Sequence, residues 1–131
     1  MTILVGYIPT PEGLAAVEAA TQEASLRNSK LIVINSSPGT SRMDVHLVDD
    51  HALKKLEADL TEAGVDVEIR QLIRGHDAAE EILDAAQQDA AELIVIGLRH
   101  RTAVGKLLLG STSQRILLHA TCPVLSVKPD H

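Results

Sequence analysis

The chain alternates short, continuous apolar runs with longer stretches in which apolar residues recur at helical spacing. Apolar runs of this length are typical of central strands in a parallel sheet that helices cover on both faces. Three runs have this character: ILVGYI (3–8), LIVIN (31–35) and LIVIG (93–97). We predict that they form the middle of such a sheet.

Two further segments are predicted as strands. In VDVEIRQL (65–72), valine and isoleucine alternate with charged residues, which indicates an edge strand with one partly solvated face. PVLSV (123–127) is apolar on both faces. Monomers rarely leave such an edge bare, so we expect a two-fold homodimer through residues 123–127.

Two helices are predicted in the first half of the chain. Thr10 and Pro11 resemble the N-cap and first residue of a helix that extends to about residue 28. A second helix is expected to end at Gly64, as at a C-cap glycine. Its apolar residues fall on one helical face: Val45, Val48, Ala52, Leu53, Leu56 and Leu60.

Two more helices are predicted in the second half. Asp77 and Glu80 form a pair like a capping box ahead of an apolar pattern. Ser111 is expected to cap a last helix that ends near His119. The alternation of strands and helices predicts a single α/β domain, residues 1–131, with a doubly wound parallel sheet of five strands and helices on both faces. In such sheets the ligand crevice lies at the carboxyl ends of the strands.

Composition narrows the range of partners. Tyr7 is the only aromatic residue and the net charge is −6, so neither stacking on bases nor binding to DNA phosphates is expected. No apolar run reaches the length of a membrane span, and the N-terminus lacks the pattern of a signal peptide. Cys122 is the only cysteine, so no intramolecular disulfide forms. We therefore expect a cytoplasmic protein without nucleic-acid or membrane partners.

The segment GLRHRTAVGKLLLGSTSQR (97–115) carries the candidate binding chemistry. Gly97 ends a predicted strand, and Gly110, Ser111 and Thr112 begin a predicted helix. A helix N-terminus offers free amide donors to an anion, and the two hydroxyl groups add further donors. The segment is neither a P-loop nor a dinucleotide fingerprint. One interpretation is a phosphate or nucleotide site; the other is a junction that serves folding alone.

The spacing in this segment resembles that of a known family. Gly97, two residues, position 100, nine residues and then Gly110-Ser111 resemble the Gly-x2-Gly-x9-Gly-Ser/Thr signature of the universal stress proteins. LLLGSTSQRIL, CPVLSVKP, GYIPTPEG and RGHDAAEEIL extend the resemblance over the whole chain. It implies an adenine nucleotide alpha hydrolase-like fold with strand order 3-2-1-4-5, ATP as the ligand, and dimers through the last strand.

The resemblance also assigns site residues. It places Ile34 where the family contacts adenine, and Ile8 where ATP-binding members usually carry aspartate. His100 stands in place of the second signature glycine, where its side chain would crowd the phosphate path. In the expected site, the loop consists of Gly97, Arg99 and His100. The phosphate cradle consists of Gly110, Ser111 and Thr112. The residues that flank the base are Ile8 and Ile34.

Two functions follow from these residues. One is a stress-response protein that binds ATP or a related nucleotide, which the intact Gly-Ser-Thr helix start favours. The other is an ATP-independent dimeric interaction module, which Ile8 and His100 favour. An enzyme is not expected, and any ATP hydrolysis should be slow, because neither a general base nor a metal-binding acid is identifiable.

Other reactive side chains have ordinary interpretations. MDVHLVDDH (43–51) could bind a metal, but its two histidines are five residues apart and acidic residues are common at helix starts, so a solvated face is favoured and no metal is predicted. Cys122 and His119 suggest a nucleophile and base, yet a buried inert thiol is favoured. His76 is interpreted as a loop residue beside a cap. Tyr7 either lines the crevice or, as we favour, packs under a helix.

Overall fold

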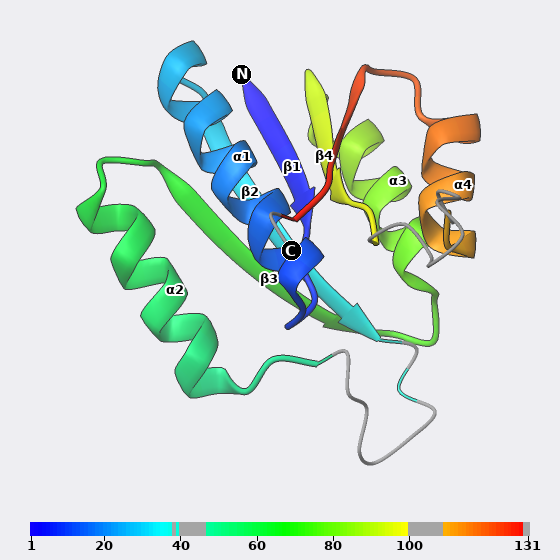
Figure 1. The fold of residues 1–131 in the computed structure, drawn as a ribbon, viewed down its shortest axis with the longest axis horizontal. Coiled ribbons are helices and arrows are strands. Elements are labelled where there is room, and N and C mark those ends of the chain that lie inside the picture. The colour runs from blue at the N-terminus through cyan, green and yellow to red at the C-terminus, as the bar shows by residue number, and fades with distance from the viewer. Residues whose placement is uncertain (38, 40–46, 100–108, 130–131) are drawn as a thin grey trace.

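The computed structural model describes residues 1–37, 39, 47–99 and 109–129. Five strands and four helices alternate along the chain (Figure 1). In chain order they are β1 (Thr2–Gly6), α1 (Pro11–Arg27), β2 (Lys30–Ser37), α2 (Asp50–Glu62), β3 (Val67–Ile73), α3 (Ala78–Gln88), β4 (Leu93–Gly97), α4 (Ser111–His119) and β5 (Val124–Val127).

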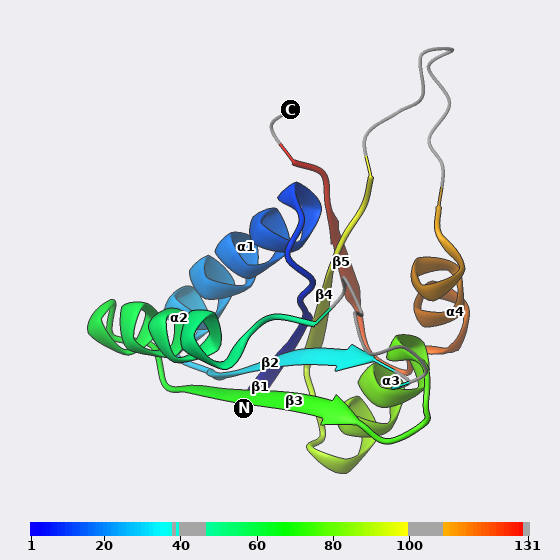
Figure 2. The same ribbon diagram turned by 90° about the horizontal axis from the view of Figure 1, so that it is seen from below.

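All strand pairs are parallel, and the order across the sheet is β3-β2-β1-β4-β5. α1 and α2 cover one face of the sheet, and α3 and α4 cover the other (Figure 2). The predicted doubly wound α/β fold and its strand order are confirmed. No helix in the described part of the chain is both long and apolar enough to cross a membrane.

The continuous apolar runs form the core because their strands are covered on both sides. Ile3 and Val5 of β1 point to the layer of α1, whereas Leu4, between them, points to the layer of α3 and α4. All three are 0% exposed. Leucine, isoleucine, valine and alanine therefore supply nearly all of the core, as the single aromatic residue requires.

The two edges of the sheet differ in polarity. On β3, Glu68 accepts from Lys30 Nζ at 2.8 Å and from Arg70 Nε at 2.5 Å. Arg70 also donates to both carboxylate oxygens of Asp89, at 2.8 and 3.1 Å. This charged network covers the β3 edge, whereas Leu125 of β5 remains 37% exposed.

Helix starts largely follow the predicted caps. The Thr10 hydroxyl accepts from the Gly13 amide at 3.1 Å, and an Asp77 carboxylate oxygen accepts from the Glu80 amide at 2.9 Å. Gly64 follows α2 with a φ of +86°, the left-handed conformation that suits glycine after a helix.

The predicted start of α2 was wrong. Val48 precedes the helix: its amide donates to Asn35 Oδ1 at 3.0 Å, and its carbonyl accepts from Gln71 Nε2 at 2.7 Å. Because side chains of β2 and β3 satisfy this backbone, the helix begins only after Asp49, which is its N-cap. Val45 lies outside the described residues.

The predicted cap of α4 was also wrong by one residue. Gly110 is the N-cap, in extended conformation with φ −68°, and Ser111 is the first helical residue. Without a side chain on Gly110, the start of α4 has no side-chain cap hydrogen bond. Its first amides therefore lack the oxygen acceptor that Thr10 and Asp77 provide for α1 and α3.

Candidate functional site

A cleft of about 370 Å³ lies at the carboxyl ends of β1, β2 and β4. Its walls come from the starts of α1, α3 and α4, which approach the cleft from both faces of the sheet (Figure 2). Seven of the residues that the sequence suggested line this one cleft: Ile8, Ile34, Gly97, Arg99, Gly110, Ser111 and Thr112. The eighth, His100, lies outside the described residues.

One part of the cleft is apolar. Ile34 of β2 and Ile96 of β4 are 2% and 4% exposed, and Ile82 of α3 and Ile116 of α4 complete this wall. Tyr7 lines the cleft and also packs against the core on the α1 side, so both of its predicted positions hold in part. Burial raises the pKa of its hydroxyl group. This wall is suited to a flat apolar group such as a base.

Another part of the cleft is the start of α4, which we call the cradle (residues 110–112). Ser111 and Thr112 are exposed, and the positive end of the helix dipole lies here. A Cβ built on Gly110 would have no described atom within 4 Å. The described part of the protein therefore does not require glycine at this position, and no described atom fills the space beside its α-carbon.

Gly97 has a different role from Gly110. A Cβ on Gly97 would overlap the backbone carbonyl of Glu12, in the first turn of α1. The glycine at the end of β4 is thus required by another part of the chain, whatever the cleft holds. The same is true of Gly13, whose Cβ would overlap the carbonyl of Ile8.

Two acidic residues of the cleft were not assigned to the site from the sequence. Glu12 and Asp77 both line it, one from α1 and one from α3. Each follows a predicted strand by a few residues, and chain that leaves the carboxyl end of a parallel strand passes the crevice. Their position shortly after a strand could have indicated that both residues lie at the cleft, although Asp77 was recognised only as a helix cap.

Asp77 connects two walls of the cleft. One carboxylate oxygen caps α3, and the other accepts from Arg115 of α4. The amide of Glu80, and secondarily the Arg115 guanidinium, lower the pKa of Asp77. The pair therefore holds the start of α3 against the helix that carries the cradle.

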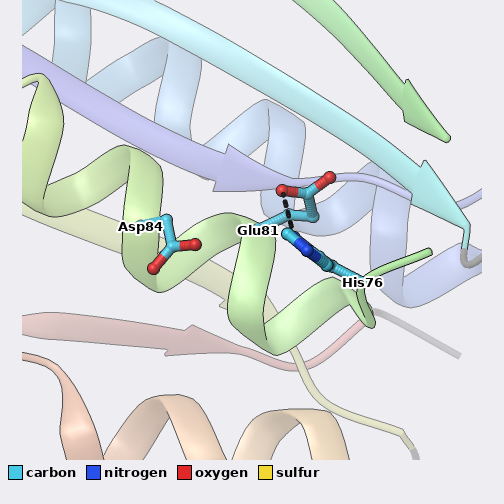
Figure 3. Close-up of side chains that lie close together, drawn as sticks. All are labelled: His76, Glu81 and Asp84. Carbon is cyan, nitrogen blue, oxygen red and sulfur yellow. Dashed lines mark ion pairs between the residues drawn. The ribbon is translucent and has the colours of Figure 1, made fainter. Parts of the chain in front are cut away.

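A second group of titratable side chains lies on α3 and in the turn just before it, beside the cleft residue Asp77. His76, Glu81 and Asp84 bring potential metal-ligand atoms within 4.8 Å of one another (Figure 3). Glu81 is fully buried, and Arg74 donates to both of its oxygens at 3.0 and 2.6 Å. Arg74 lowers the pKa of this carboxyl group. The guanidinium already supplies the positive charge that a metal ion would bring.

The remaining candidates from the sequence lie apart from the cleft lining. Asp49 caps α2 and His51 is exposed, whereas Asp44 and His46 lie outside the described residues. Cys122 is half-buried beside the α3 and α4 layer, where burial raises the pKa of its thiol. A raised pKa reduces the thiolate fraction that a nucleophile needs.

Comparisons with known proteins agree with this architecture. Residues 1–128 match the universal stress protein family. A universal stress protein of Mycolicibacterium smegmatis is 49% identical over 127 residues, which cover 97% of each chain. Two solved universal stress protein structures from Archaeoglobus fulgidus each cover 98% of both chains. One is 30% identical with a TM-score of 0.77, and the other, in complex with dAMP, is 25% identical with a TM-score of 0.70. The chain therefore belongs to the universal stress protein family.

Proposed function

We propose that this protein is a stress-response protein that binds an adenine nucleotide, ATP or a related one, in the cleft at the carboxyl end of the sheet. The observation that carries the proposal is the open space at Gly110. A helix start without a side-chain cap faces the cleft there, and a phosphate group would supply the missing acceptor. The dAMP bound by the related Archaeoglobus fulgidus protein supports an adenine nucleotide as the ligand.

The orientation of the nucleotide follows from the polarity of the cleft. The base would lie between Ile8 and the apolar wall around Ile34, and the phosphates would meet the cradle. Arg99, which also lines the cleft, adds positive charge for the phosphates. The isoleucine at position 8 removes one polar contact to the nucleoside but keeps an apolar surface for it.

We propose binding rather than catalysis as the role of this cleft. Of its acidic side chains, Asp77 already holds a helix amide and Arg115. That leaves Glu12 as the one carboxylate of the described cleft lining without a partner, and a metal-assisted phosphoryl transfer would need further protein groups to hold the ion and orient the attacking water. Any hydrolysis of ATP is therefore expected to be slow.

The test is a calorimetric titration of the wild-type protein with ATP, with and without Mg²⁺, and with AMP. Gly110→Asp places a carboxylate in the cradle and also provides a good N-cap, so it should weaken nucleotide binding at least tenfold without destabilising α4. Gly110→Asn is the matched control, because it caps the helix without the charge and should weaken binding less. Unchanged affinity in Gly110→Asp would contradict the proposal.

A second candidate function is a homodimeric interaction module, and the observation that favours it is the uncovered edge of β5. Leu125 is 37% exposed there, and no charged side chain is part of Val124–Val127. The β3 edge, in contrast, carries a charged network. Sedimentation equilibrium of the wild type and of Leu125→Lys tests this: a dimer that the substitution dissociates supports it, and a wild-type monomer at high micromolar concentration contradicts it.

A further inference from the structure

The carboxylate of Glu12 has no assigned role in the cleft, although Glu12 is one of the residues that line it. Glu12 is in the first turn of α1, and its β-carbon lies 3.1 Å from the position of a Cβ built on Gly97. The side chain therefore starts beside the end of β4, and Glu12 is part of the cleft lining. Within the described part of the chain, no hydrogen bond or ion pair engages its carboxylate.

The order of the strands places Glu12 between the two parts of the cleft. Ile34 of β2 is level with Gly6 at the end of β1, and Gly97 ends β4 on the other side of β1. α4 follows β4 in the chain and carries the cradle. A nucleotide with its base near Ile34 and its phosphates at the cradle would have its sugar over β1 and β4, beside Glu12.

Chemistry selects the sugar as the partner of this carboxylate. An ionised carboxylate accepts hydrogen bonds and donates none, so it repels phosphate. The N6 amino group of adenine is also a donor, but it belongs to the base, which the proposed orientation places against the apolar wall near Ile34. The ribose hydroxyl groups are donors, and hydrogen bonds to a charged acceptor are among the stronger ones in proteins. Asp77, the other carboxylate of the cleft, is already occupied by the Glu80 amide and Arg115.

We infer that Glu12 is the residue that recognises the ribose hydroxyl groups of the bound nucleotide. The inference rests on the proposed nucleotide-binding function and adds a determinant of sugar specificity to it. Glu12 thus replaces, from the first turn of α1, the polar contact that Ile8 cannot make from the end of β1. Nucleotides with a ribose diol should therefore bind more tightly than those without one.

The experiment compares AMP with 2′,3′-dideoxy-AMP by calorimetry. The wild-type protein should bind AMP about tenfold more tightly, the ratio expected for one hydrogen bond to a charged group. Glu12→Gln should reduce this ratio, and Glu12→Ala should bring it close to one, with the affinity for dideoxy-AMP almost unchanged. Titration with dAMP then separates the 2′ hydroxyl from the 3′ hydroxyl.

The control is Glu18→Ala, an identical truncation at an exposed position of α1 outside the cleft. It should leave the ratio at the wild-type value, and thermal unfolding checks that each variant is folded. If Glu12→Ala changed the affinities for AMP and dideoxy-AMP by the same factor, the inference would be overturned, because a general effect of charge does not depend on the ribose hydroxyl groups. A wild type that binds both ligands equally would overturn it while leaving the proposed function intact. A wild type that binds neither would overturn both.

Discussion

The carbonyl oxygen of Glu12 lies 2.1 Å from the place where a β-carbon on Gly97 would be, too close for any side chain there. The end of β4 and the first turn of α1 thus approach each other closely, and both residues line the cleft. A glycine that resembles part of a phosphate loop in the sequence is therefore a packing residue in the structure.

Gly97→Ala should destabilise the protein, because the added methyl group would meet the backbone of Glu12, which cannot move aside as a flexible side chain can. Overpacking of this kind costs about 1–3 kcal/mol. Urea unfolding measures the loss, with Gly110→Asn as the control, because that glycine has open space beside it. Equal stability of Gly97→Ala and the wild type would contradict this prediction, because it would mean that the backbone at Glu12 moves away from residue 97 without a loss of free energy of unfolding.

Asp77→Asn separates the two functions of Asp77. Asparagine still caps α3, so only the ion pair with Arg115 is lost, at a cost of roughly 0.2–1 kcal/mol for an exposed pair. Because α4 carries the cradle, nucleotide affinity should fall more than this small change in stability suggests. A double-mutant cycle with Arg115→Gln, followed by calorimetry, measures the coupling; additive effects on affinity would argue against it.

The charged network on β3 predicts how stability depends on pH. Hydrogen bonds from Arg70, and then from Lys30, lower the pKa of Glu68 to about 2 from its ordinary 4.5. A lowered pKa in the folded state means that the stabilisation is complete above pH 4.5 and is lost as the pH falls toward 2. Glu68→Gln should therefore be less stable than the wild type at pH 7.

The stability difference between Glu68→Gln and the wild type should shrink over the same interval of pH. Chemical unfolding at several pH values measures it. Glu57→Gln, at an exposed position of α2, provides the matched control and should show no comparable change. A difference that stays constant down to pH 2 would mean that Glu68 gains nothing from its partners.

Arg74→Ala should leave the buried carboxylate of Glu81 without its main partner. His76 Nδ1 remains nearby at 3.7 Å, but the two hydrogen bonds from Arg74 are lost. An uncompensated buried acceptor costs about 1–3 kcal/mol, and more when it is charged. Arg74→Lys keeps the charge without the planar fork, so its loss should be smaller.

The deficit of Arg74→Ala should depend on pH. Since Arg74 lowers the pKa of Glu81 from its ordinary 4.5, protonation below pH 4.5 removes an interaction that only the wild type possesses. The two proteins should therefore converge in stability as the pH falls. Thermal unfolding at pH 7 and pH 3.5 measures this, and a deficit that grows in acid would contradict the assignment.

Much of the fold could be predicted from local patterns. The apolar runs at residues 31–35 and 93–97 lie within or coincide with β2 and β4, because only covered parallel strands are apolar on both faces. Thr10 and Asp77 cap α1 and α3, since a cap depends on neighbours within four residues. The start of α2 could not be predicted, because side chains from two strands, Asn35 and Gln71, hold Val48 outside the helix.

The sequence by itself determined the strands, most helix starts, the family and seven of the residues that line the cleft, because each depends on local pattern or motif spacing. Only the tertiary structure decided what the two glycines do. Gly97 and Gly110 look alike in the sequence, yet one is packed against the Glu12 carbonyl and the other faces open space. It also decided that Glu12 and Asp77 share the cleft, because crossovers bring together residues that are 65 positions apart in the chain.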